Sequence, residues 1–143
     1  MKIKQISVFV ENRKGTLYKL SKALSDNNID LKALSIADTS KFGIMRCIVN
    51  NAEEALEVIK NANFTANITE VLAVEVADKP GGLALVLEVL DKEDINVEYL
   101  YSFVRSNCDG ALIILRVEEV ERAIEAFEKS NLKILTNEEV TEI

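Results

Sequence analysis

The chain has 143 residues, of which 48% are hydrophobic and 29% are charged, a balance typical of a globular protein. Its net charge of −7 is unevenly spread: residues 1–70 carry 10 basic and 8 acidic side chains (+2), whereas residues 71–143 carry 7 and 16 (−9). Because nucleic-acid binding draws most of its affinity from clustered lysine and arginine, the acidic second half argues against a nucleic-acid partner.

The sequence lacks several residue types on which catalysis and metal binding depend. Histidine is absent, and the two cysteines, Cys47 and Cys108, are far apart and form no Cys-x-x-Cys pair. Zinc ribbons, histidine-based triads and imidazole general bases are therefore excluded, and we expect neither a metal nor a cofactor. Cys47 lies within an apolar run, so we expect a buried thiol there. No apolar run approaches the roughly 20 residues of a membrane span, and we expect a cytoplasmic protein with no membrane partner.

The first half begins with an alternating pattern and then becomes helical. Lys2–Val10 alternates apolar and polar residues, as a half-buried strand does. Gly15 then opens a helix with leucines at helical spacing, and Asn27-Asn28 supplies a left-handed stop. The elements expected next are a strand at Ile29–Asp38, a turn at Lys41–Gly43, a strand at Ile44–Val49, a helix capped by Asn51 and an extended segment at Phe64–Val71.

The second half repeats this order at an offset of 81 − 15 = 66 residues, which places Gly81 on Gly15. The expected elements are a strand at Leu72–Val76, a helix from Gly81, a strand at Val97–Val104, a turn at Ser106–Gly110, a strand at Ala111–Val117, a helix within Glu118–Glu128 and a last strand starting at Leu132–Leu135. Each half is then β-α-β-β-α-β, which predicts an α+β fold of two ferredoxin-like domains, residues 1–70 and 71–143. In each domain an antiparallel sheet carries both helices on one face.

The two strand–glycine–helix junctions are the candidate ligand sites. Such a junction presents free backbone N–H groups and the positive end of a helix dipole, which suit a carboxylate. A carboxylate ligand that also carries an ammonium group would need an acceptor for that group, and the side chains placed for this are Asn12 and Asp78, with charge favouring Asp78. The structural alternative is that both side chains cap turns and that the glycines only permit the bend. The main-chain groups of the two sites are Gly15, Thr16 and Leu17 in the first junction and Gly81, Gly82 and Leu83 in the second.

A row of aromatic residues adds a second candidate surface. Tyr99, Tyr101 and Phe103 alternate along one strand, so they share one face. If both halves have the same facing, this row points away from the helices and needs a cover, either a subunit partner or a ligand. Subunit packing and contact of Tyr99 and Tyr101 with a ligand both remain open.

The element order and the two turns, Asn12–Gly15 and Asp78–Gly81, resemble those of the ACT domain, and the whole chain resembles a tandem pair of such domains. The second turn, with Pro80 before the glycine, is closer to the family pattern than the first, which has Lys14 there. The resemblance implies modules that pair side by side and bind a free amino acid at their seam. It also implies a non-enzymatic, stand-alone regulatory protein that modulates a separately encoded enzyme and forms a homodimer through sheet edges or the helix-free sheet face.

Two other functions fit parts of the sequence. A regulatory subunit that has lost its ligand would use the open sheet face and the acidic helix only for interaction. A small acylphosphatase-like hydrolase would use Arg13 in a phosphate-cradling loop with Asn12 nearby. However, this loop lacks a glycine-dense cradle, and the second half has Lys79 in place of Arg13.

Overall fold

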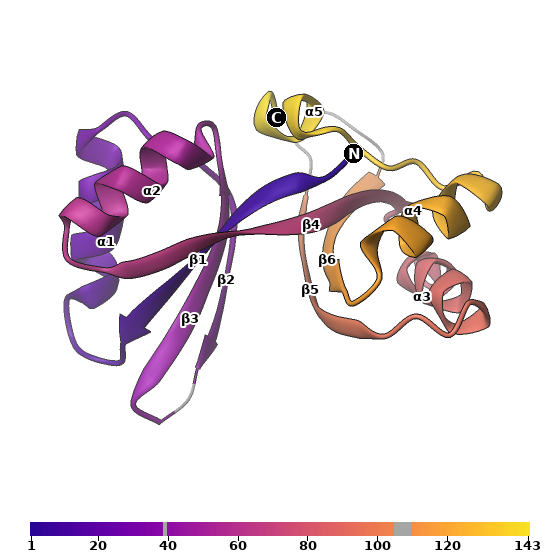
Figure 1. Ribbon diagram of the computed structural model, residues 1–143, viewed down its shortest axis with the longest axis horizontal. Helices are drawn as coiled ribbons and strands as arrows, with labels where there is room; N and C mark the ends of the chain where they lie inside the picture. The colour runs from indigo at the N-terminus through magenta and orange to yellow at the C-terminus, as the bar shows by residue number, and fades with distance from the viewer. Residues whose placement is uncertain (39, 105–109) are drawn as a thin grey trace. The chain divides into compact units, whose positions relative to one another are not determined.

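The computed structural model describes residues 1–38, 40–104 and 110–143 (Figure 1). These residues form six strands and five helices, which confirms the predicted α+β fold. The elements are β1 (Ile3–Glu11), α1 (Thr16–Asp26), β2 (Leu31–Asp38), β3 (Phe42–Val49), α2 (Ala52–Asn61), β4 (Thr65–Ala77), α3 (Gly82–Lys92), β5 (Val97–Val104), β6 (Gly110–Val117), α4 (Val120–Lys129) and α5 (Asn137–Thr141). None of the helices formed by these residues is both long and apolar enough to cross a membrane.

The chain divides into two compact units. The N-terminal unit comprises Lys4–Thr69 with Glu142, and the C-terminal unit comprises Met1–Ile3, Glu70–Thr141 and Ile143. The expected turn at Ser106–Gly110 falls largely on residues 105–109 and so lies, like Cys108, outside the described residues.

The N-terminal unit is an antiparallel sheet with one helical face. Its strand order is β2-β3-β1-β4, and β3 pairs with both β1 and β2. Alternate residues of β1, such as Ile6 and Val8, are buried against the helices, because successive side chains of a strand point to opposite faces. Leu20 of α1 and Ile59 of α2 complete this core, and Cys47 of β3 is fully buried within it, as predicted.

Local sequence signals set the helix boundaries in this unit. Asn51 caps α2: its side-chain oxygen accepts from the Glu54 N–H at 3.2 Å, and its amide donates to the Glu54 carboxylate at 3.1 Å. Asn28, with φ 58°, follows α1 and confirms the predicted left-handed stop. Asn63, with φ 67°, has the same role after α2.

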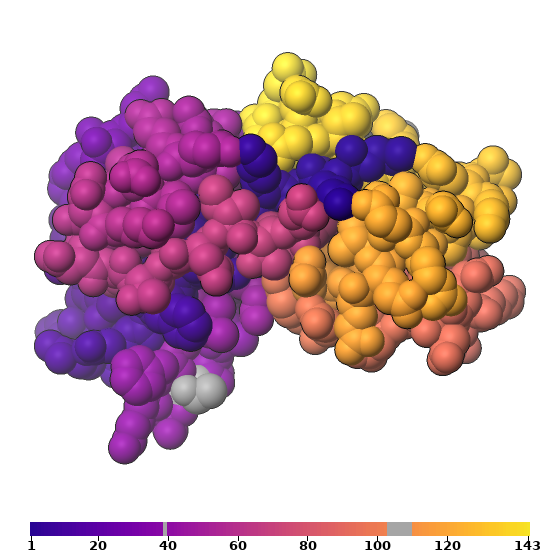
Figure 2. Space-filling model, viewed as in Figure 1, coloured from indigo at the N-terminus to yellow at the C-terminus, as the bar shows by residue number. Residues whose placement is uncertain are grey.

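The C-terminal unit repeats this construction. The strand β6 pairs with both β4 and β5, and residues such as Val74 and Leu115 are buried against Val86 of α3 and Phe127 of α4. In the space-filling view, α4 forms much of the near surface of this unit (Figure 2). The segments Phe64–Val71 and Leu72–Val76 were expected to be extended and consecutive, and all of their residues except Phe64 belong to one strand, β4.

Two local expectations were wrong. The segment Leu132–Leu135 is no full strand: it forms an isolated bridge, Val74 with Ile134, and two main-chain bonds of 2.9 Å to β4. The chain then leaves the sheet because Thr136 and Glu139 form a capping box that starts α5, with bonds of 2.8 and 3.2 Å. The expected turn at Lys41–Gly43 was also misplaced, since β3 already begins at Phe42 and pairs there with Glu11.

Candidate ligand-binding site

The two glycine junctions have nearly the same backbone conformation. Gly15 lies at φ 89°, ψ −11° before α1, and Gly81 lies at φ 90°, ψ −11° before α3. Both are left-handed, a region that glycine enters without the penalty of a Cβ atom. Within the described residues no side chain caps either helix, so the first-turn N–H groups keep the partial positive charge of an open helix start.

Part of each junction is already hydrogen-bonded internally. The N–H of Thr16 donates to the Arg13 carbonyl at 3.2 Å, and the N–H of Gly82 donates to the Lys79 carbonyl at 3.0 Å. These two amides therefore close the turns. A carboxylate at either junction would have to use the neighbouring amides of the first helical turn instead.

The junctions differ in how closely the helix start approaches the preceding strand. A Cβ atom added at Gly82 would lie 2.2 Å from the carbonyl oxygen of Ala77, so only glycine fits there. The matching position in the N-terminal unit, at the offset of 66, is Thr16, which carries a side chain and is half-buried. The first junction is thus the more open of the two.

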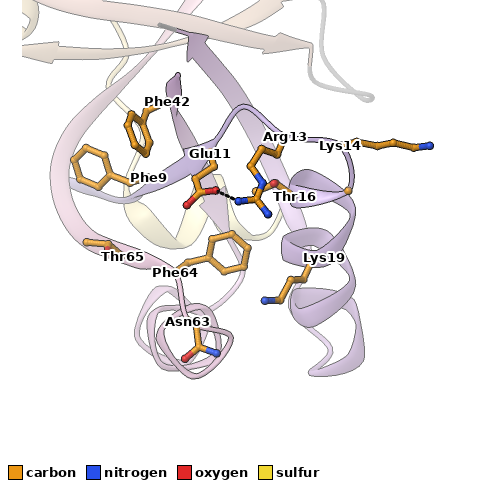
Figure 3. Close-up of a pocket in the computed structure, with 11 residues that line it drawn as sticks. Phe9, Glu11, Arg13, Lys14, Thr16, Lys19, Phe42, Asn63, Phe64 and Thr65 are labelled. Atoms are coloured by element: carbon orange, nitrogen blue, oxygen red, sulfur yellow. Dashed lines mark ion pairs between the residues drawn. The ribbon is translucent and has the colours of Figure 1, made fainter. Parts of the chain in front are cut away.

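The first junction borders a cavity of about 550 Å³ in the N-terminal unit (Figure 3). Gly15 and Thr16 line it together with three aromatic and four charged residues. The aromatic residues are Phe9, Phe42 and Phe64, and the charged residues are Glu11, Arg13, Lys14 and Lys19. The cavity opens where β1 ends and β3 begins, beside the turn that joins α2 to β4.

The charged groups of this cavity have different surroundings. Arg13 Nη1 lies 3.0 Å from Glu11 Oε2, so these two charges are paired. Lys19 Nζ lies 5.6 Å from the centre of the Phe64 ring, a cation–π distance. In Figure 3 the Lys14 side chain points away from the other residues, whereas Lys19 points toward Phe64.

The remaining predicted residues of the first junction lie elsewhere. Asn12 is exposed, and its N–H donates to the Lys41 carbonyl at 3.1 Å. Leu17 lines a second, apolar cavity of about 230 Å³, whose walls also include Tyr18 and Ile36. Gly15 and Thr16 thus line the first of these two cavities, Leu17 lines the second, and Asn12 lines neither.

At the second junction, Asp78, Pro80, Gly81 and Leu83 are exposed and Gly82 is buried. A cavity of about 580 Å³ in this unit is lined by the last residues of β4, by Gly110 at the start of β6 and by the segment that follows α4. None of residues 78–83 lines it. Its lining includes Glu75 and Lys133, whose charged groups are 3.0 Å apart.

The tyrosines lie on the side of the sheet opposite α3 and α4. Tyr99 pairs with Arg116 and Tyr101 with Ile114, in alternation with Leu115, which belongs to the helix-side core. Tyr99 and Tyr101 therefore share one face, which points away from α3 and α4, as the alternation along the strand predicts. Tyr101 is only 8% exposed, so it offers little surface to a ligand. The side chain of Phe103 lies outside the described part of the structure.

The aromatic residues of the first cavity were not predicted from the sequence as members of a site. Phe9 and Phe42 are half-exposed, at 50% and 54%, although large apolar residues are usually buried. Phe9 lies on the polar side of the alternating strand β1. A large apolar residue at such a position could have indicated an aromatic residue exposed on the sheet surface.

The chain matches the model of the ACT domain pair over residues 1–143, and it belongs to this family. Protein BT0572 from Bacteroides thetaiotaomicron has a similar crystal structure, with a TM-score of 0.93 and 34% identity over 100% of this chain and 98% of that one. The ligand-free regulatory subunit of aspartate kinase from Thermus thermophilus has a TM-score of 0.63 and 18% identity, over 88% of this chain and 91% of that one. The regulatory subunit of aspartate kinase from Thermus flavus has a TM-score of 0.61 and 18% identity, over 88% of this chain and 90% of that one. At this identity the two subunits share the fold. No curated protein matches the chain in sequence.

Proposed function

We propose that this protein is a non-catalytic regulatory protein that binds a free amino acid where ACT modules pair, and that it modulates a separate enzyme. The observation that carries the proposal is the duplicated junction, in which Gly15 and Gly81 share one left-handed conformation before an uncapped helix. Membership of the ACT domain pair family supports it, as does the likeness of fold to regulatory subunits of aspartate kinase.

The proposed chemistry follows from the groups at each junction. The carboxylate of the amino acid accepts from first-turn N–H groups, where the helix dipole contributes about 0.3–1 kcal/mol. The ammonium group requires an acceptor, and Asp78 supplies a charged one on an exposed loop, while Asn12 supplies a neutral one. The second junction is therefore the stronger candidate for a zwitterion.

The proposed assembly is a homodimer through the edge of the N-terminal unit. The strand β2 is an edge strand, and an unpaired edge offers N–H and C=O groups to another strand. Leu34 and Ile36 of β2 and Leu17 and Tyr18 of α1 are exposed by 41–70%, so an apolar strip follows this edge.

Isothermal titration with the twenty amino acids tests the proposal. We expect one or a few to bind, and we expect Asp78→Ala to weaken binding about tenfold or more, because the ammonium group loses a charged partner. Asp91→Ala, at the far end of α3, is the matched control and should bind as the unchanged protein does. Lack of binding across the panel by a folded dimer would favour the interaction-only alternative.

A further inference from the structure

The first cavity is lined by aromatic and charged side chains. Three of the five phenylalanines of the chain line it, and two of them are half-exposed. Its charged residues, Glu11, Arg13, Lys14 and Lys19, sum to +2 in a chain of net charge −7. A wall that combines flat apolar rings with excess positive charge suits a molecule that carries a ring and an anionic group.

The C-terminal unit is an internal control for this cavity, because it has the same fold. At the offset of 66, Phe9 corresponds to Glu75 and Lys19 to Leu85. On the opposite wall, Asn63 and Asn131 both have a left-handed backbone and are equivalent positions in the two units. By this equivalence Phe64 corresponds to Leu132 and Thr65 to Lys133. The C-terminal unit therefore forms the same strand and helix ends without the rings of Phe9 and Phe64 and without a lysine at the position of Lys19.

In the C-terminal unit the corresponding space holds an ion pair. Glu75 Oε2 and Lys133 Nζ are 3.0 Å apart, so the two charges at this wall satisfy each other. In the N-terminal unit these positions are Phe9 and Thr65, and no such pair forms between them. The difference leaves the first cavity lined by an apolar ring where the second is lined by paired charges.

Lys19 is the cation of the first cavity whose side chain points toward the aromatic rings, whereas the Lys14 side chain points away from the other lining residues (Figure 3). Among residues 1–38, 40–104 and 110–143, no carboxylate lies within ion-pair distance of its Nζ, which instead lies over the Phe64 ring. Arg13, by contrast, is held by Glu11 at 3.0 Å. An incoming anion would thus find its counter-ion at Lys19, beside the ring of Phe64.

We propose that this cavity, which borders the first junction, is a ligand site distinct from the amino-acid site at the second junction, and that it binds a small aromatic carboxylic acid. The carboxylate pairs with Lys19 and the ring packs among Phe9, Phe42 and Phe64. An ammonium group on the ligand weakens binding, since the cavity lining already has an excess of positive charge and its one carboxylate is paired with Arg13. The site therefore favours an aromatic acid without an amino group over the corresponding amino acid.

The test uses four probes with the full chain: phenylacetate, uncharged phenylacetamide, non-aromatic hexanoate and zwitterionic phenylalanine. Binding is followed by amide chemical shifts in two-dimensional NMR. We expect phenylacetate to bind tightest and to move the resonances of Thr16, Lys19 and Thr65, which line the cavity. Removal of the charge should weaken binding about tenfold, since one charge-assisted contact is worth roughly that much. Removal of the ring should weaken it by a similar factor of about ten, because the contacts with the phenylalanine rings are lost.

The variants replace cavity residues by those of the C-terminal unit. Lys19→Leu and Phe9→Glu should each weaken phenylacetate at least tenfold, whereas Lys22→Leu, the same change one turn along α1 and outside the cavity, should leave it unchanged. Thermal melts confirm that each variant is folded. The proposal is overturned if phenylacetate moves no cavity resonance, if Lys19→Leu binds it as well as Lys22→Leu does, or if phenylalanine binds the cavity more tightly. Because Asp78→Ala leaves this cavity intact, amino-acid binding can fail or succeed independently of this result.

Discussion

Gly15 and Gly81, 66 residues apart, have backbone angles that agree within a degree, yet the residues that follow them meet different surroundings. After Gly15 comes Thr16, with room for its side chain, and after Gly81 comes Gly82, with none. The backbone of the junction has thus been kept while the fit of helix against strand has changed. This difference gives the first prediction.

Gly82→Ala should destabilise the protein by about 1–3 kcal/mol, because the new Cβ atom would lie 2.2 Å from the Ala77 carbonyl oxygen and the backbone would have to shift. Thr16→Ala, at the matching position, should change the free energy of unfolding by less than about 0.5 kcal/mol. Urea denaturation of both variants measures the effects. Equal effects would show that the close approach of α3 to β4 contributes nothing.

Asn51→Ala should lower the free energy of unfolding by about 1 kcal/mol, because the Glu54 N–H loses its acceptor at the start of α2. The matched control is Asn61→Ala at the other end of the same helix, where no capping bond is removed by the change. Thermal unfolding compares the two. A loss for Asn61→Ala as large as that for Asn51→Ala would contradict the capping argument.

Cys47 should make stability depend on pH in the alkaline range. Burial raises the pKa of its thiol from 9.0 to about 12. The unfolded chain therefore loses the Cys47 proton first as pH rises, and the stability present below pH 9 is lost between pH 9 and pH 12, at about 1.4 kcal/mol per pH unit.

The Cys47 effect is isolated in a Cys108→Ser background. Between pH 8 and pH 10 this protein should lose about 1.4 kcal/mol more than the same protein with Cys47→Ala, measured by urea denaturation. Identical pH dependence of the two proteins would show that the thiol ionises as easily in the folded state as in the unfolded one.

Ile36→Lys should convert the proposed homodimer into a monomer, because it places a charge on the exposed apolar strip of the edge strand β2. Light scattering after size-exclusion chromatography measures the mass at matched concentrations. Ser40→Lys, in the exposed turn after β2, is the control and should leave the mass unchanged. A dimer that survives Ile36→Lys would exclude this edge as the interface.

The periodicity of the sequence predicted most of the fold. Apolar alternation in β1 and leucine spacing in α1 are local signals, and both identified real elements. The last segment failed because apolar residues at Leu132–Leu135 predicted a strand, whereas two main-chain bonds and one bridge are all that form there. The spacing of Thr136 and Glu139 was a signal for the helix that follows.

The site was less predictable than the fold. The glycine junctions could be found because a left-handed turn favours glycine, which is visible in the sequence. The cavity beside Gly15 could not, since it brings together Phe9, Phe42 and Phe64 from three separate segments. Only the pairing of β1 with β3, and the turn from α2 into β4, place these rings around one space.

The ion pair between Glu75 and Lys133 makes the two repeats chemically different at equivalent places. A repeat whose two copies had identical pockets would respond to one kind of compound only. With the two ligand sites proposed above, this difference would let a single polypeptide respond to two chemically unlike compounds.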